Sequence, residues 1–172
     1  MANTFELIAS STVGSGGVSS IIFSSIPQTY TDLLLKVSIR DGDDNQAFLK
    51  FNSSTTGYSA LRLQGTGAVA QSTTDSSTSQ GVFGYSVNQN ASRTANTFGN
   101  AEIYIPNYTG STAKSFSSDG VEENNATTAY SKLFAGLLTA TAAITSITLS
   151  SNTTSAIFYQ YSTAYLYGVK SS

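Results

Sequence analysis

Carboxylates are the side chains of this sequence best suited to general acid–base chemistry. A glycosidase uses two of them, placed on either side of the bond that it cleaves. Glu102 is the best single candidate, because it lies inside a predicted strand beside Ile103 and Ile105. Alternation along that strand also predicts a side chain that simply points into solvent, and the sequence supplies no partner carboxylate. The ten acidic residues are Glu6, Asp32, Asp41, Asp43, Asp44, Asp75, Glu102, Asp119, Glu122 and Glu123.

One acidic run has the beginning of a calcium-binding pattern. Asp41, Asp43 and Asn45 have the spacing of the first three ligands of an EF-hand loop. The pattern then fails, because Gln46 stands where that loop needs Gly, and Asn52 stands where it needs Glu. Asp, Gly and Asn are typical turn residues, so we expect a solvated turn and no metal site.

Two further polar segments are predicted to be loops. Residues 122–125 (Glu-Glu-Asn-Asn) have the composition of a loop. Residues 14–17 (Gly-Ser-Gly-Gly) lack the Lys-Ser/Thr of a phosphate-binding loop and the helix that should follow it. We expect a flexible turn between two strands there, and no bound nucleotide.

The composition removes several classes of chemistry. The chain has no His and no Cys, so it has no Ser-His-Asp triad, no Cys nucleophile and no Cys/His zinc site. These absences and the unpaired Glu102 predict no catalytic, cofactor-binding or metal-binding residues. We therefore expect a protein that is not an enzyme and needs no cofactor.

The charge is low and nearly balanced. The 172 residues include 10 acidic and 8 basic ones, for a net charge of −2. Nucleic-acid binding requires a basic face, so we expect no nucleic-acid partner. The start of the chain lacks the basic and apolar regions of a signal peptide, and no apolar run approaches the ~20 residues of a membrane span. A surface-like composition without a signal or a span favours a protein assembled inside a cell and exposed later, as virion components are, with no membrane partner.

The apolar periodicity is that of strands. Short alternating segments are separated by Gly, Asn, Ser and Thr at intervals of about ten residues, which is typical of an all-β, antiparallel sandwich or barrel. In one of them, Leu35, Val37 and Ile39 are expected on one face. We expect about ten short strands in a single domain, residues 1–172. The predicted strands are 17–23, 33–40, 47–51, 60–63, 81–87, 101–105, 114–118, 133–138, 144–149 and 164–169.

The connections between these strands are also predicted. Residues 71–80 and 110–118 have low complexity and are expected to be loops or loop–strand junctions. Residues 30–32 (Tyr-Thr-Asp) follow Pro27 and have the composition of a corner, in which the Asp or Thr side chain can satisfy a free backbone group.

The aromatic residues are 10 Tyr and 9 Phe, without Trp. Tyr159, Tyr161, Tyr165 and Tyr167 keep one parity, so Tyr165 and Tyr167 should share a face of the last strand. A Tyr-rich face can bind a sugar or a protein. The interpretation we favour is that these rings fill the sandwich core or its rim, because apolar residues occupy the other face of the strand as well.

Two parts of the sequence resemble a known class of proteins. The first part is residues 5–14 followed by 21–33, which end in F-S-S-I-P-Q-T-Y-T-D-L, and the second is residues 144–149 leading to 164–169 (A-Y-L-Y-G-V). The resemblance is to small β-sandwich virion proteins of tailed bacteriophages. Those proteins show F-x-x-I-P-x-T-Y-x-D-L near the start and a-x-L-Y-G-I near the end. The departure is Val169, where Ile is usual.

The resemblance implies a jelly-roll-like sandwich without enzymatic activity. It implies a capsid cement or decoration protein, which binds the major capsid protein on the outer capsid surface of the virion as a homotrimer after assembly in the host cytoplasm. A tail-fibre or tail-tip module that recognises a cell-surface glycan through exposed Tyr and Asn remains open, as does a glycan-degrading enzyme. Residues 1–5 and 71–80 are the segments expected to contact the partner, because termini and long polar loops often reach outward.

Overall fold

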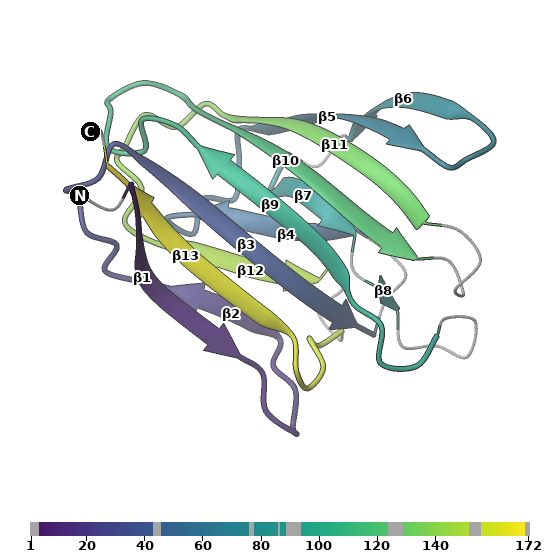
Figure 1. The fold of residues 1–172 in the computed structure, drawn as a ribbon. Coiled ribbons are helices and arrows are strands. Elements are labelled where there is room, and N and C mark those ends of the chain that lie inside the picture. Colours follow the sequence, from purple (N-terminus) through teal and green to yellow (C-terminus); the bar gives the residue numbers. More distant parts are fainter. Residues whose placement is uncertain are drawn as a thin grey trace.

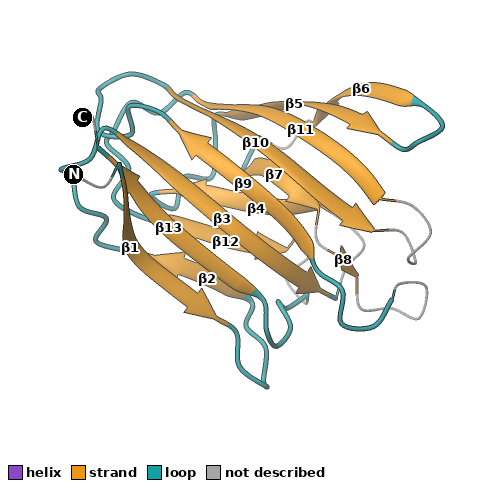
Figure 2. Cartoon of the chain, in the orientation of Figure 1, coloured by secondary structure: helices purple, strands orange, loops and turns teal. Residues whose placement is uncertain are grey.

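The structure is a computed structural model that describes residues 4–42, 46–75, 78–85, 87–88, 94–123, 129–151 and 156–170. Within these ranges the chain is all-β, with two antiparallel sheets packed face to face and no helix (Figures 1 and 2). The prediction of an antiparallel β-sandwich is therefore confirmed.

The larger sheet has eight strands along its main path. Their spatial order is β1 (Phe5–Thr12), β13 (Thr163–Val169), β3 (Asp32–Asp41), β9 (Gly99–Ile105), β10 (Lys114–Glu123), β11 (Ala129–Leu138), β5 (Tyr58–Gly65) and β6 (Ala70–Asp75). The smaller sheet contains β2 (Ser20–Phe23), β12 (Ile147–Ser151), β4 (Gln46–Phe51) and β7 (Gly81–Tyr85), in that order. A two-residue strand, β8 (Val87–Asn88), pairs in parallel with the end of β3.

Eight of these strands form a jelly roll. The order β1-β13-β3-β9 in one sheet faces β2-β12-β4-β7 in the other, which is the arrangement of two Greek keys in a double-sheet roll. The remaining pairs are insertions: β5–β6 lies between β4 and β7 in the sequence, and β10–β11 lies between β9 and β12. Both insertions join the larger sheet and widen it beyond the smaller one (Figure 1).

The core lies between the two sheets and follows the period-two alternation. Leu35, Val37 and Ile39 of β3 are buried together, as predicted. They pack in one cluster with inward residues from β9, β12 and β13. Phe116 of β10 extends this core under the inserted strands, where its ring meets Phe51 edge-on at 5.8 Å between centroids.

The predicted corner before β3 is confirmed. The Asp32 carboxylate accepts the backbone N–H of Asn107 at 2.8 Å and the hydroxyl of Tyr104 at 2.7 Å. On the other side of the corner, the Tyr108 hydroxyl donates to the backbone carbonyl of Pro27. These contacts attach the loop before β3 to the loop after β9. The turn at residues 14–17 is confirmed too, with a Gly17 N–H to Gly14 carbonyl bond of 3.1 Å.

Lys114, at the start of β10, is a buried cation held by backbone carbonyls. Its ammonium donates to Gly110, to Thr112 at 2.6 Å and to Thr141 at 3.1 Å. Burial lowers the pKa of Lys114, because desolvation disfavours the charged form. The residue thereby joins the β9–β10 connection to the β11–β12 connection.

Two segments with predicted loop composition contain strand residues, while residues 76–77 and 124–125 within them lie outside the described part of the chain. Residues 71–75 form most of β6, which pairs in regular register with β5. An edge strand whose side chains are exposed on both faces has no apolar alternation, so its Ser/Thr-rich sequence resembles a loop. Glu122 and Glu123 are the last residues of β10, and the buried Glu122 carboxylate forms an ion pair with Lys132 of β11. The pairing between strands, which the sequence does not show, creates that buried site.

Gly136 provides a test of the packing under the inserted strands. A Cβ atom at this position would lie 2.0 Å from the Phe116 ring, so we expect Gly136→Ala to destabilise the fold by about 1–3 kcal/mol through overpacking. Gly65→Ala, on neighbouring β5 with nothing within 4 Å of its Cβ, is the matched control. Urea unfolding measures both, and equal stabilities would contradict the packing described here.

Candidate interaction face

The most distinctive surface of the molecule is the side of the eight-stranded sheet that points away from the four-stranded sheet. We call it the outer face. In Figure 1 it is turned towards the viewer, and none of the described strands or loops lies across it. Its residues are those that alternate with the buried core residues along each strand. What these side chains are, and how the strands align them, determines what this surface can do.

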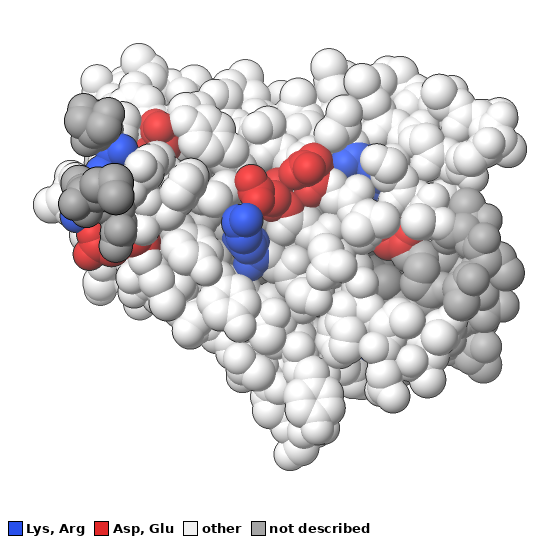
Figure 3. Space-filling view, in the orientation of Figure 1, with Lys and Arg blue, Asp and Glu red and all other residues white. Residues whose placement is uncertain are grey.

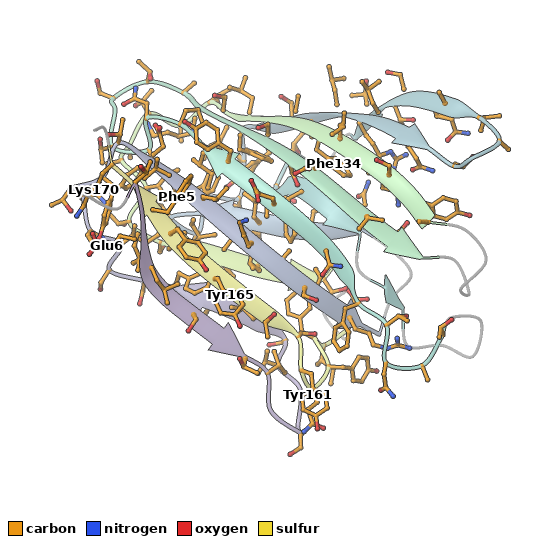
Figure 4. The ribbon with its side chains drawn as sticks, in the orientation of Figure 1. Phe5, Glu6, Phe134, Tyr161, Tyr165 and Lys170 are labelled. Atoms are coloured by element: carbon orange, nitrogen blue, oxygen red, sulfur yellow. The ribbon has the colours of Figure 1, made fainter. Side chains whose placement is uncertain are left out.

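One end of the outer face is rich in aromatic side chains. Phe5 and Leu7 project from β1, with 54% and 52% of their surfaces exposed. Tyr165 and Tyr167 project beside them from β13, and Tyr167 is paired directly with Leu7. Figure 4 shows Phe5 and Tyr165 over these two strands. We call these four residues the aromatic half.

The other end of the outer face is aliphatic. Leu61 and Leu63 of β5 and Leu133 and Leu137 of β11 are all exposed there. Leu133 is paired directly with Leu63. A shallow depression of about 440 Å³ runs between Leu63, Leu133 and β6. We call these four residues the leucine half.

A short charged ridge separates the two halves. Lys36 of β3 is paired with Glu102 of β9, and Glu102 is paired with Asp119 of β10. The Lys36 ammonium lies 2.8 Å from the Glu102 carboxylate, and both side chains are about half exposed. The hydrogen bond to Glu102 raises the pKa of Lys36. Figure 3 shows charged side chains gathered near the middle of this face, with uncharged surface around them.

The position of Glu102 on the ridge shows the surroundings of this acid–base candidate. Glu102 points outward, as the alternation predicted. Asp119 is the neighbouring carboxylate that sequence reasoning missed, because only the antiparallel register of β9 and β10 brings the two together. They stand side by side on an open surface, beside depressions of about 450 Å³ and 350 Å³. A glycosidase instead holds its two carboxylates on opposite sides of the scissile bond.

The preferred prediction for the C-terminal tyrosines is wrong. Ala164 and Leu166 face the core and are fully buried, whereas Tyr165 is exposed on the outer face and Tyr167 is half-buried there. The last strand is therefore covered on one side only. Tyr161 lies in the turn before β13 and is exposed.

The other sequence candidates do not form a second site. Asp41 is the last residue of β3 and is buried rather than solvated, while Asp43, Asp44 and Asn45 lie outside the described residues. Among the residues that the structure does describe, no group of three or more acidic side chains is arranged to hold a metal ion. The same part of the chain contains no helix suited to crossing a membrane.

Two segments were expected to contact a partner. Of residues 1–5, the first three lie outside the described part, and Phe5 lies on the aromatic half. Of residues 71–80, the first five belong to the edge strand β6, and residues 76–77 are outside the described part. Figure 1 shows that the β5–β6 hairpin extends beyond the body of the sandwich.

Comparison of the chain with protein-family models, with curated proteins and with solved structures finds no match.

The pKa of Tyr104 depends on the neighbouring Asp32 carboxylate and can therefore be used to test this contact. The hydrogen bond to Asp32 raises the pKa of Tyr104 above its usual 10.0. We expect Asp32→Asn to move the Tyr104 pKa back towards 10.0, because the amide keeps an acceptor for Asn107 but removes the charge. An NMR titration of the Tyr104 ring measures the change. Asp119→Asn removes another carboxylate of the outer face and should leave the Tyr104 pKa in place; the same shift in both variants would contradict the assignment.

Proposed function

We propose that this chain is a non-enzymatic structural protein of a tailed-phage virion, a capsid cement or decoration protein that binds the outer capsid surface and stabilises contacts between capsomers. The observation that carries the proposal is the outer face, a broad sheet surface with exposed Phe, Tyr and Leu side chains. Soluble proteins seldom expose large contiguous apolar patches, and such patches mark interaction sites. The resemblance of residues 23–33 and 164–169 to virion proteins supplies the setting.

The chemistry of the chain supports a passive role. The sequence has no His or Cys, and the Glu102 carboxylate is ion-paired with Lys36 on an open ridge. A protein that holds others together needs a rigid surface rather than a reactive group. The buried core and the continuous strand pairing supply that rigidity.

The partners follow from the same proposal. The major capsid protein is the first, and further copies of this chain are the second, with a homotrimer as the arrangement that the resemblance implies. The β5–β6 hairpin, which extends from the body, is the segment that we propose reaches towards the capsid. The place of action is then the outer capsid surface, after assembly in the host cytoplasm.

A tail-fibre or tail-tip module that binds a cell-surface glycan is the second candidate. It is favoured by the exposed Tyr104 ring, which borders a depression of about 350 Å³ together with Glu102, Ser117 and Asp119. Aromatic faces flanked by hydrogen-bonding groups suit sugar rings, since a sugar has both apolar and hydroxyl surfaces.

The copy number in the virion tests the first candidate. We expect quantitative mass spectrometry of purified particles to find about one copy per major capsid subunit, because a cement protein must occupy repeated sites over the whole capsid. A few copies per particle, in multiples of three or six, would move the protein to the tail. Absence from the particle would overturn both virion assignments.

A glycan array tests the second candidate. If the outer face binds sugars, the chain should bind particular glycans, and Tyr104→Ala should abolish that binding because the stacking ring is lost. Tyr161→Ala, which removes an exposed ring in the turn before β13, is the matched control and should retain binding. No bound glycan, together with a high copy number, would leave only the cement assignment.

A further inference from the structure

We propose that a second copy of this chain covers the outer face, so that two copies pair face to face about a two-fold axis that runs along β9. This inference concerns how the chain associates with itself. It does not depend on the virion role, and it would stand if that role were wrong. In such a pair the outer face is buried between the copies, so contact with a capsid falls to the β6 edge, which lies outside the overlapping strands. It replaces the three-fold arrangement implied by the resemblance with a two-fold one.

The charges of the ridge favour an identical partner. Lys36 and Asp119 lie one strand to either side of Glu102, in a single row of paired residues. A two-fold axis along β9 exchanges the two sides, so it places Lys36 of each copy opposite Asp119 of the other. The surface is thus complementary to itself in charge, with two such contacts in every pair.

The same two-fold axis also places the aromatic half of one copy over the leucine half of the other. The axis places β13 over β11 and β1 over β5 of the other copy, following the strand order of the sheet. Residues paired across neighbouring strands form rows that run across the sheet. In the row that contains Lys36, Glu102 and Asp119, Tyr165 of one copy then faces Leu133 of the other. In the next outward-facing row, Leu7 of one copy faces Leu61 of the other. The aromatic half of each copy therefore packs on the leucine half of its mate, and both apolar surfaces leave water together.

The size of the face suits a stable pair. Seven strands overlap in this arrangement, from β1 to β5, and at about 4.8 Å between strands they span roughly 30 Å. Strands of seven residues are about 23 Å long, so the flat area of sheet that each copy covers on the other is roughly 700 Å². Side chains that protrude from the sheet add to this area. Specific protein interfaces bury about 800 Å² per partner, so the outer face has the area that such a pair needs.

Glu102 makes the arrangement distinctive. It lies on the axis, so the Glu102 carboxylates of the two copies meet there, each with its own Lys36 at 2.8 Å. Like charges in an interface weaken association. Replacing Glu102 by Gln should therefore tighten the pair, which is the opposite of what a structural ion pair within one chain would predict.

Charge reversal with complementary variants tests the proposal. Lys36→Glu places two carboxylates opposite each other in a pair of identical copies, and Asp119→Lys places two ammonium groups opposite each other. Each variant alone should associate at least tenfold more weakly than the unmodified chain. An equimolar mixture should pair again, because the carboxylate introduced in one variant then faces the ammonium introduced in the other. The second contact of the mixed pair joins the native Lys36 and Asp119. Rescue in a mixture cannot arise from contacts within one chain.

Sedimentation equilibrium of the purified full chain and of each variant gives the readout. We expect the unmodified chain at twice its 18.0 kDa mass, the single variants shifted towards monomer, the mixture restored to the pair, and Glu102→Gln more tightly associated. Gln71→Glu, a change of charge on an exposed position of β6 outside the overlapping strands, controls for non-specific effects and should leave association unchanged. Circular dichroism confirms that each variant folds.

Several results would overturn the inference. They are a monomeric unmodified chain at tens of micromolar, an assembly of three copies, single variants that pair as well as the unmodified chain, or a mixture that stays monomeric. None of these bears on copy number in the particle. A homotrimer in solution together with one copy per capsid subunit would reject the face-to-face pair and keep the cement role.

Discussion

The structure depends on the antiparallel register of β3, β9 and β10. Backbone hydrogen bonds fix which residues stand opposite each other, and the period of two then assigns every side chain to the core or to the outer face. Because Leu35 and Ile103 are paired and buried, the positions next to them in each strand must point outward. The same constraint that builds the core therefore lines up Lys36, Glu102 and Asp119 on the opposite side.

The two inserted hairpins change what the jelly roll can do. Without the inserted hairpins, the eight jelly-roll strands would make two sheets of equal width, each with one face in the core. The pairs β10–β11 and β5–β6 extend one sheet only, and their inward residues Phe116 and Phe134 are covered by the smaller sheet and its neighbours. Their outward residues carry the leucine half of the outer face. The insertions thus create the apolar area on which both the proposed function and the proposed pairing rest.

The errors of the sequence-based predictions have a common physical origin. The β6 segment looks like a loop because an edge strand exposed on both faces has no apolar alternation to reveal it. Glu122 looks like a loop residue because its partner, Lys132, is brought to it only by the β10–β11 pairing. Tyr165 and Tyr167 appear suited to the core because a strand with apolar residues on both faces resembles a strand buried on both sides. Each error concerns which surface covers a strand, a property of neighbours distant in sequence.

The sequence by itself determined the class of fold, the inward face of β3 and the corner at Asp32, because period-two alternation and turn composition are local properties of the chain. It also determined that imidazole and thiol chemistry are absent and that Glu102 points outward. The tertiary structure alone decided the strand order, the jelly-roll connections and the neighbours of Glu102. It also decided that one whole face of the larger sheet lies open. Those features depend on which strands pair, and pairing is selected by the packing of the entire core rather than by any single segment.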